Sequence, residues 1–310
     1  MAGTRLTPRQ LRAIAAVVEL RNISHAAVEL GVSQPSLSRM ITKIEADLET
    51  ELFQRDSNGV VPTEAGERLA ERGSEVVRQL DDIEDEIRSL DGNLHGRVCV
   101  AMPDTTAHAL FLPVLDRIAS HHPDVEVRMM GAHPNNVPLA LSAGDADVGV
   151  VSSAHRHEGL ELRTLVTESL HLVGPSQRRK RRGPVDLASV AELPLALPGI
   201  QPGLRQLIDR AFSSVGLRPN VVQEVDSQDA LVELIQAGRA YSIMAYAGVV
   251  RPAARGVVDA YEINNPTIER TLSTAFRRGR TPTRLMLAVE ATLHNVATEL
   301  AAEARWTPSE

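Results

Sequence analysis

Apolar residues recur at intervals of three or four along the first fifty residues, and this spacing predicts α-helices. Three such stripes are present, at Leu11–Val18, Ala26–Leu30 and Leu37–Leu48. Thr7, Ser24 and Ser33 precede them as the expected N-caps. Gly31 lies between the second and third stripes, where a left-handed residue commonly ends a helix. Two helices joined by so short a turn, over about Asn22 to Ile41, form a helix-turn-helix.

The third predicted helix has a second, polar face. Ser36, Arg39 and Lys43 lie on it at helical intervals, and Gln34 stands at the start of the helix. Hydroxyl, amide and guanidinium groups in this position suit base edges and phosphates in the DNA major groove. An ordinary solvated helix face has a similar composition, so this face alone leaves both interpretations open.

A β-hairpin is predicted directly after these helices, within Glu51–Pro62. Asn58-Gly59 is a strong signal for a two-residue hairpin turn. A hairpin after a recognition helix is a wing, and Arg55 is expected at its base, near the DNA backbone. The hairpin therefore favours the DNA-binding interpretation of the third helix.

Residues 6–66 resemble the signature of LysR-type transcriptional regulators. The blocks that carry the resemblance are Ala26-Ala27, Val32–Arg39, Ile44-Glu45, Leu48, Leu52–Arg55 and Pro62–Gly66. They follow one another in order. The chain departs from the family at Ile14 and Ile23, where aromatic residues are usual, and at Pro62, where leucine is more common. These are core or turn positions and do not touch the proposed DNA-reading face.

The resemblance implies a winged helix-turn-helix that binds double-stranded DNA. Together with the polar face of the third helix, it gives a set of expected DNA contacts. These are Ser33, Gln34, Pro35, Ser36, Ser38, Arg39, Lys43 and Arg55.

Residues 63–92 carry an apolar pattern that repeats every 3.5 residues, after Thr63 as N-cap. Its positions are Leu69, Gly73, Val76, Leu80, Ile83, Ile87 and Leu90. Such a heptad favours a partner helix, and a second copy of the chain is the obvious partner; packing on the chain's own domain is the alternative. In the resembled family this segment is the linker helix of a dimer, which implies a homodimer, with a homotetramer as the expected larger assembly.

The net charge of −7 is concentrated in this helical segment. Residues 61–95 hold four basic and ten acidic residues, a net charge of −6, whereas residues 1–60 hold seven of each. The overall acidity therefore does not exclude a local basic face on the first module.

Beyond residue 95, short apolar strands alternate with helices, which predicts an α/β fold with a parallel sheet. Strands are expected at 98–102, 125–130, 148–151, 171–173, 195–197, 221–225, 241–245 and 268–276. Helices are expected at 106–120, 135–143, 203–215, 227–237 and 282–305. This order predicts lobe I at about 96–165 and 267–310, and lobe II at about 166–266, with crossings near Val166 and Pro266.

This region also resembles the family's effector domains, which are similar to periplasmic solute-binding proteins and hold a ligand between two lobes. Several stretches resemble the nitrogen-assimilation-control branch, among them Leu90–Gly96, Leu172–Pro175 and Leu195–Pro198. Open α/β sheets bind ligands at the carboxyl ends of strands, beside helix N-termini. The candidate residues there are Thr105, Thr106, Ser152, Gln201, Gly203 and Tyr246. Their hydroxyl, amide and backbone N–H groups suit a small anionic effector; Thr106 has a simple N-cap as its alternative role.

Other chemistries find little support in the sequence. The longest stretch without charged residues, Met129–Gly144, is too short and too polar to span a membrane, so no membrane association is expected. The single Cys99 fits a reducing cytoplasm. The ten histidines show no metal-ligand spacing, and nucleotide-binding and nucleophile motifs are lacking, so we expect no metal, no cofactor and no enzymatic activity. Arg178–Arg182 is an unusual basic run that fits a solvated loop better than an auxiliary DNA contact.

The favoured interpretation is a cytoplasmic transcriptional regulator with three parts. These are a winged helix-turn-helix at 1–62, a dimerising linker helix at 63–92 and a two-lobed effector domain at 93–310. The alternative is a solute-binding protein or a bilobed enzyme in which residues 1–95 serve as an oligomerisation arm.

Overall fold

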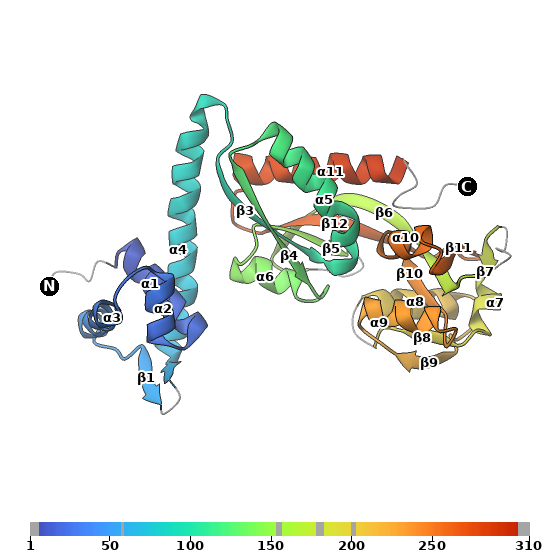
Figure 1. The fold of residues 1–310 in the computed structure, drawn as a ribbon, viewed down its shortest axis with the longest axis horizontal. Helices are drawn as coiled ribbons and strands as arrows, with labels where there is room; N and C mark the ends of the chain where they lie inside the picture. The colour runs from blue at the N-terminus through green and yellow to red at the C-terminus, as the bar shows by residue number, and fades with distance from the viewer. Residues whose placement is uncertain (1–5, 57–58, 153–156, 178–182, 200–202, 303–310) are drawn as a thin grey trace. The chain divides into compact units, whose positions relative to one another are not determined.

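Packing divides the chain into two units, Met1–Gly92 and Asn93–Glu310 (Figure 1). The computed structural model describes residues 6–56, 59–152, 157–177, 183–199 and 203–302. Each unit has hydrophobic cores of its own. Within the described residues, no helix is both long and apolar enough to cross a membrane.

The first unit is built on three helices, α1 (Pro8–Leu20), α2 (Ile23–Glu29) and α3 (Gln34–Leu48). Their apolar stripes meet in one core, which includes Ile14, Val17, Ala26, Leu37, Ile41 and Ile44. Thr7 caps α1 as expected, and with Gln10 it forms a capping box. The predicted cap of α2 is wrong, because Asn22 rather than Ser24 caps it by accepting a hydrogen bond from the His25 N–H. Ser33 occupies the N-cap position of α3 without a side-chain hydrogen bond.

The wing is a two-stranded antiparallel hairpin of β1 (Phe53–Asp56) and β2 (Gly59–Pro62). Of the predicted Asn58-Gly59 turn, Asn58 lies outside the described residues, and Gly59 is the first residue of β2, paired with Asp56. Gly59 has φ 142°, and a Cβ there would lie 2.8 Å from the carbonyl oxygen of Arg21. The Val60 N–H donates to that same oxygen, at 3.2 Å. The close approach to the end of α1 therefore requires glycine at this position.

Helix α4 (Glu64–Arg88) follows the wing, capped by Thr63, and the short 3₁₀ turn η1 (Ser89–Asp91) ends it. Its first half packs on the rest of the unit. A Cβ on Gly66 would collide with the carbonyl oxygen of Leu52, and one on Gly73 would lie 2.9 Å from Cδ2 of Leu11. The two glycines thus allow α4 to lie against the chain before β1 and against α1.

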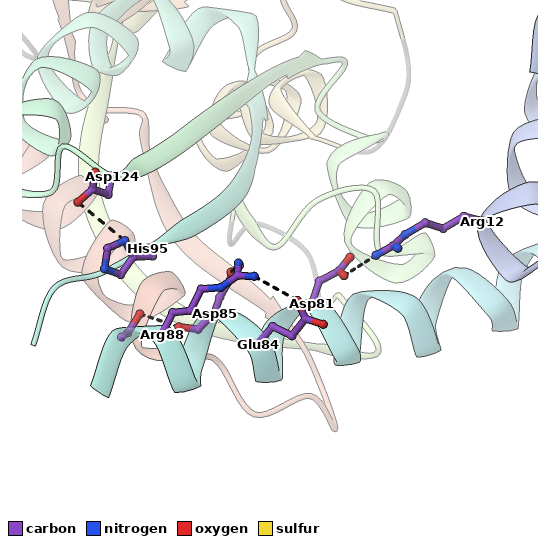
Figure 2. Close-up of polar contacts among 8 residues, drawn as sticks. Arg12, Asp81, Glu84, Asp85, Arg88, His95 and Asp124 are labelled. Carbon is purple, nitrogen blue, oxygen red and sulfur yellow. Dashed lines mark hydrogen bonds and ion pairs between the residues drawn. The ribbon is translucent and has the colours of Figure 1, made fainter. Parts of the chain in front are cut away.

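Surface ion pairs follow α4 along its length. Arg12 of α1 pairs with Asp81 of α4 at 2.5 Å, and Arg88 pairs with both Glu84 and Asp85 at 3.4 Å (Figure 2). The side chains of Arg12 and Asp81 are half exposed, so their attraction contributes at most about 1 kcal/mol. The Arg12–Asp81 pair orients α4 on α1 more than it stabilises the unit, whereas both pairs of Arg88 lie within α4 itself.

The second unit is organised by an eight-stranded mixed sheet in the order β4-β3-β5-β12-β6-β11-β7, with β10 also paired to β6. Its strands are β3 (Gly96–Pro103), β4 (Val125–Ala132), β5 (Val148–Ser152), β6 (Leu160–Pro175), β7 (Val185–Asp186), β10 (Ser242–Ala245), β11 (Val258–Asn264) and β12 (Glu269–Arg277). Strands β8 (Leu195–Leu197) and β9 (Val221–Glu224) form a separate parallel pair. The predicted parallel arrangement holds for β4-β3-β5, whereas β12 runs antiparallel to both of its neighbours.

The first lobe is covered on both faces of its strands (Figure 1). Val98, Val100 and Met102 of β3 pack towards α5 (Asp104–His121) and α11 (Arg284–Ala302). The intervening Cys99 and Ala101 pack towards α6 (Val137–Ala143). A strand buried on both faces must be apolar throughout, which is why β3 was recognisable from sequence.

In the second lobe, too, helices cover both faces of the strands. Leu170 and Leu172 of β6 face α7 (Leu187–Ala191) and α8 (Leu204–Ser214), while Val173 faces α9 (Gln228–Gln236) and α10 (Tyr246–Ala254). Four elements of this lobe were not predicted, namely β7, α7, α10 and β11. The expected strand at 171–173 is the end of the 16-residue β6, whose earlier half is largely exposed.

Strands β6 and β12 join the two lobes. They pair from Leu160 opposite Arg277 to Ser169 opposite Glu269, with one irregularity in register, between Leu272 and Ser273. The side chains of Leu165 and Leu272 belong to a core of the first lobe, and those of Leu170 and Ile268 belong to a core of the second. The chain therefore crosses from the first lobe to the second between Leu165 and Leu170, and it crosses back between Ile268 and Leu272.

A buried histidine of β6 makes the second unit sensitive to acid. His171 is fully buried, and this burial lowers its pKa from 6.5 to about 4 despite a hydrogen bond between its Nδ1 and the Ser169 carbonyl oxygen. In the unfolded chain the imidazole regains its ordinary pKa. Below pH 6.5 the unfolded state therefore binds a proton that the folded state does not, and folding stability falls until the pH approaches 4.

We predict that His171→Phe removes this part of the acid lability. Between pH 7 and pH 5 the parent protein loses about 2 kcal/mol of unfolding free energy through this histidine, since one pKa unit is worth about 1.36 kcal/mol. Urea unfolding of the second unit at both pH values measures the difference. His121→Phe, at an exposed position, is the matched control for replacing a histidine by phenylalanine. Equal acid lability in His171→Phe and the parent would contradict the assignment.

Candidate functional site

The polar face of α3 is accessible. Leu37, Ile41 and Ile44 are buried in the core of the first unit, so the opposite side of the helix is turned outwards. Of the predicted DNA contacts, Ser33, Gln34, Pro35, Arg39 and Lys43 are exposed, and Ser36 and Ser38 are half-buried. Arg39 Nε donates to the Pro35 carbonyl oxygen at 3.2 Å, which folds the side chain back along the first turn.

The wing is attached directly to this helix. Glu45 of α3 accepts hydrogen bonds at one carboxylate oxygen from the backbone N–H groups of Leu52 and Phe53, at 2.9 and 3.1 Å. These bonds fix the entry to β1 relative to α3. Arg55 lies in β1 opposite Val60, and its side chain is outside the described part of the structure. Glu45 belongs to one of the sequence blocks that resemble the LysR signature, but no contact was predicted for it, although an acidic residue on the core side of a helix is itself a signal.

The apolar seam of α4 is divided between two environments. Leu69 and Gly73 pack within the first unit, Gly73 against Leu11 of α1. From Val76 onwards the seam is exposed, with accessible fractions of 47% at Val76, 38% at Leu80, 55% at Ile83, 62% at Ile87 and 71% at Leu90. Packing on the chain's own domain thus accounts for the beginning of the seam but not for the rest.

A cavity of about 150 Å³ lies between the two lobes of the second unit. The first lobe contributes Thr105, His133, Pro134 and Asn135 to its wall, and Arg270 lies on the connecting strand β12. The second lobe contributes residues from α8, α9, β10 and α10. They include Gly203, Leu204, Arg205, Leu231, Ile243, Met244 and Ala245, and the adjoining loops add Pro198, Gly199 and Asp226.

Three helices begin at this cavity without a side-chain cap. They are α5, whose first turn contains Thr105, α8, which starts after Gly203, and α10, which starts after Ala245. The first N–H groups of a helix have no partner within the helix and carry partial positive charge. Asp104 offsets this charge at α5, whereas the first turns of α8 and α10 hold no acidic residue. The second lobe therefore presents two positive helix ends to the cavity.

Charged side chains at the cavity are partly neutralised by their neighbours. Arg205 is buried and donates to Asp209, Glu224 and the Pro198 carbonyl oxygen. Asp226 accepts a hydrogen bond from the Gly199 N–H at 3.0 Å. Arg270 donates through Nε to Glu168 at 2.6 Å.

The structure brings only some of the predicted effector residues together. Thr105 and Gly203 line the cavity. Thr106, Ser152 and Tyr246 are not among its lining residues, and Gln201 lies outside the described residues, as does the basic run at 178–182. Thr106 is buried, with no hydrogen-bond partner for its hydroxyl in the described structure, and it does not act as the N-cap of α5.

Ser152 and Tyr246 have other neighbours. The Ser152 carbonyl oxygen lies 2.9 Å from Nε2 of His157. Tyr246 is the first residue of α10, and its ring contacts that of His171 with centroids 5.6 Å apart. Arg270 was not predicted as a cavity residue, because the strand that contains it was predicted from its apolar residues alone. Its place at the lobe crossing depends on the pairing of β12 with the distant strand β6.

Comparison with known families decides what this architecture is. Residues 91–298 match the LysR substrate binding domain, and residues 8–67 match the bacterial regulatory helix-turn-helix of the lysR family. The chain belongs to the LysR family of transcriptional regulators. Family members are DNA-binding regulators with an effector-binding domain, so the alternative of a solute-binding protein or an enzyme is set aside. The expected winged helix-turn-helix joined to a two-lobed α/β domain is confirmed.

The curated relatives of this LysR regulator include other transcriptional regulators. The nitrogen assimilation regulatory protein nac of Klebsiella aerogenes is 28% identical over 241 residues, which cover 76% of this chain and 77% of that protein. The HTH-type transcriptional regulator BbuR of Bordetella bronchiseptica is 28% identical over 269 residues, or 86% and 83% of the two chains.

Solved structures show the same fold. Full-length CbnR complexed with its target DNA aligns with a TM-score of 0.69 and 25% identity, covering 94% of this regulator and 100% of that chain. A full-length OxyR variant from Pseudomonas aeruginosa aligns with a TM-score of 0.73 and 19% identity, covering 94% and 95% of the two chains. The likeness to OxyR concerns the fold alone.

We predict that Glu45→Ala weakens DNA binding by this regulator and lowers the stability of its first unit. Two backbone N–H groups lose a charged acceptor, which costs about 1–3 kcal/mol of unfolding free energy, and the wing loses its fixed position beside α3. Glu45→Gln keeps an acceptor oxygen and should recover most of both properties. Chemical denaturation and a gel-shift titration measure the two effects. If Glu45→Ala behaves like the parent in both assays, Glu45 does not position the wing.

Proposed function

We propose that this LysR regulator binds a two-fold-related DNA site as a homodimer and that an anionic effector between the lobes changes its DNA affinity. The proposal assigns residues 1–62 to DNA binding, 63–92 to dimerisation and 93–310 to effector binding, and places the protein in the cytoplasm. The observation that carries it is the combination of an exposed polar face on α3 with an exposed apolar seam on α4. One surface suits DNA and the other suits a second copy.

DNA recognition is assigned to α3 and the wing. Gln34 and Arg39 are exposed on the first turns of α3, in the position from which a recognition helix contacts base edges. The terminal nitrogens of Arg39 have no partner among the described residues, since only Nε is bonded. Arginine can therefore form the bidentate contact with guanine or a contact with phosphate.

We expect Arg39→Ala to weaken specific binding by about 1–3 kcal/mol if Arg39 contacts a base. If it contacts only a phosphate, the loss should be similar on specific and unrelated DNA and should decrease the salt dependence. Gel-shift titrations at several salt concentrations, with the DNA upstream of the regulator's own gene and with unrelated DNA, separate the two cases. Arg72→Ala, at an exposed arginine of α4, is the control. Unchanged affinity for both DNAs would remove Arg39 from the interface.

Dimerisation is assigned to the second half of α4 together with Leu90 in the turn η1. Five successive heptad positions expose large apolar side chains there, while the surrounding positions carry charged residues. Two such helices packed together would remove this apolar surface from water, which is the ordinary driving force of a coiled-coil contact. Pairing of dimers into a tetramer is the expected larger assembly, on the strength of the family resemblance.

Ile83→Asp should give monomers and abolish tight binding to a two-fold DNA site. A carboxylate in the apolar seam cannot be buried without a partner, and a monomer holds only one half-site. Sedimentation analysis and gel-shift titration measure the two consequences. Glu86→Gln, outside the seam, is the control and should stay dimeric. A dimer that survives Ile83→Asp, and also Leu80→Asp, would mean that the contact lies elsewhere.

The effector is assigned to the cavity between the lobes. The uncapped N-termini of α8 and α10 and the Thr105 hydroxyl offer hydrogen-bond donors, which suit an anion. A ligand that contacts both lobes prefers one arrangement of them over another. It can alter DNA affinity only by that preference.

A further inference from the structure

We infer that Arg270 anchors the carboxylate of the effector and that Glu168 holds Arg270 in place at the crossing between the lobes. The effector is then a small organic carboxylate with an apolar body. This inference rests on the proposed effector site and deepens it by naming the ligand class and the residue that selects it.

Arg270 and Glu168 form a buried ion pair on the two strands that connect the lobes. The two residues stand directly opposite each other in the pairing of β12 with β6. Arg270 Nε donates to Oε1 of Glu168 at 2.6 Å. The Glu168 side chain is fully buried, whereas the Arg270 side chain is 13% exposed and lines the cavity. The pair is therefore buried on the strand side and open on the cavity side.

The open side of Arg270 offers unused donors. A guanidinium has five N–H groups in a planar fork, and the bond to Glu168 uses only the one on Nε. Within the described residues, neither terminal nitrogen has a partner, and neither is fully enclosed. Two parallel N–H groups at this edge match the two oxygens of a carboxylate.

Arg205 is a weaker candidate for the same role. Its guanidinium already contacts two carboxylates and a carbonyl oxygen, and its side chain is more deeply buried than that of Arg270. A second anion there would add to the negative charge of Asp209 and Glu224. Arg270 faces a single carboxylate, Glu168, so its charge is the one more available to a ligand.

The rest of the wall indicates an organic ligand. Four apolar residues, Leu204, Leu231, Ile243 and Met244, are among those that line the cavity. Binding gains free energy when an apolar group of the ligand covers accessible apolar surface of this wall, at roughly 25 cal/mol per Å² removed from water. Inorganic sulfate or phosphate would satisfy Arg270 but leave this surface uncovered. A volume of about 150 Å³ limits the body to a short branched chain or a single ring.

The position of Arg270 also couples the ligand to the lobes. Arg270 lies between Ile268, in a core of the second lobe, and Leu272, in a core of the first, and Glu168 lies likewise between Leu165 and Leu170. A carboxylate held by the terminal nitrogens of Arg270 is thereby linked, through the Arg270–Glu168 pair, to both connecting strands at once. Ligand binding and the arrangement of the lobes are coupled at this crossing.

The test uses the full-length regulator and a panel of monocarboxylates, each beside its neutral amide. The probes are 2-methylpropanoate, 3-methylbutanoate, cyclohexanecarboxylate and benzoate, the four matched amides, and sulfate and phosphate. Thermal shift at millimolar ligand identifies binding, because a ligand that binds only the folded state raises Tm, and calorimetry then gives Kd. We expect at least one carboxylate to bind, with its amide at least about tenfold weaker and the inorganic anions without effect.

The variants remove the anchor without leaving a buried charge. Arg270→Gln alone would leave Glu168 buried and unpaired, which destabilises the fold, so the double variant Glu168→Gln/Arg270→Gln is used. We expect it to lose at least about tenfold in affinity for the carboxylate. Arg210→Gln, at an exposed arginine of α8, is the matched control and should bind as the parent does.

Thr105→Trp fills the cavity and separates this inference from the proposed function. A carboxylate that binds the parent but neither Thr105→Trp nor the double variant supports the anchor. If binding is lost in Thr105→Trp but kept in the double variant, the cavity is the site and Arg270 is not the anchor. If it is kept in Thr105→Trp, the proposed effector site itself is wrong. Equal binding of acid and amide, equal binding of sulfate, or no binding across the panel overturns the assigned ligand class.

Discussion

The pairing of β6 with β12 is the interaction on which the larger unit of this LysR regulator depends. Nine residue pairs join two segments about a hundred positions apart in the sequence, and the same two strands enter the cores of both lobes. The lobes therefore share a continuous sheet and have separate hydrophobic cores. The polar residues Glu168 and Arg270 of β6 and β12 lie at the crossing, between the residues that enter the two cores.

A comparable constraint governs the smaller unit. Helix α4 must lie close to α1 and to the chain before β1, and it does so only because Gly66 and Gly73 carry no side chain. The close packing buries the first part of the heptad seam and fixes the direction in which the remainder leaves the unit. The exposed residues from Val76 to Leu90 are thus a continuation of a packed helix face. One apolar repeat therefore serves a contact within the unit at its beginning and leaves the rest of its length available to a partner.

Positive groups lie at the two separate places to which we assign anionic partners. On α3 the cations Arg39 and Lys43 are exposed on a surface whose opposite side is apolar. At the cavity the positive groups are helix N-termini and arginines that retain acidic neighbours. An exposed cation suits a polyanion such as DNA, whose binding to the protein weakens as the salt concentration rises. A cation held by a carboxylate inside a cavity suits a small ligand that must also match the shape of the cavity wall.

The sequence alone determined the features that depend on the pattern of neighbouring residues. Helical periodicity and caps indicated α1, α3, α4 and α9, uninterrupted apolar residues indicated the strands β3, β5 and β8, and a series of fixed-spacing blocks led to the LysR family. The exposed half of β6 and the helix α10, which contains Gly248 and Pro252, carried no such signal, because their structure is imposed by neighbouring strands and helices. Tertiary structure alone decided which residues meet at the cavity. It placed Thr105 there and left Thr106, Ser152 and Tyr246 elsewhere, and it brought in Arg270 from a distant part of the chain, because strand register and not sequence spacing determines which side chains converge.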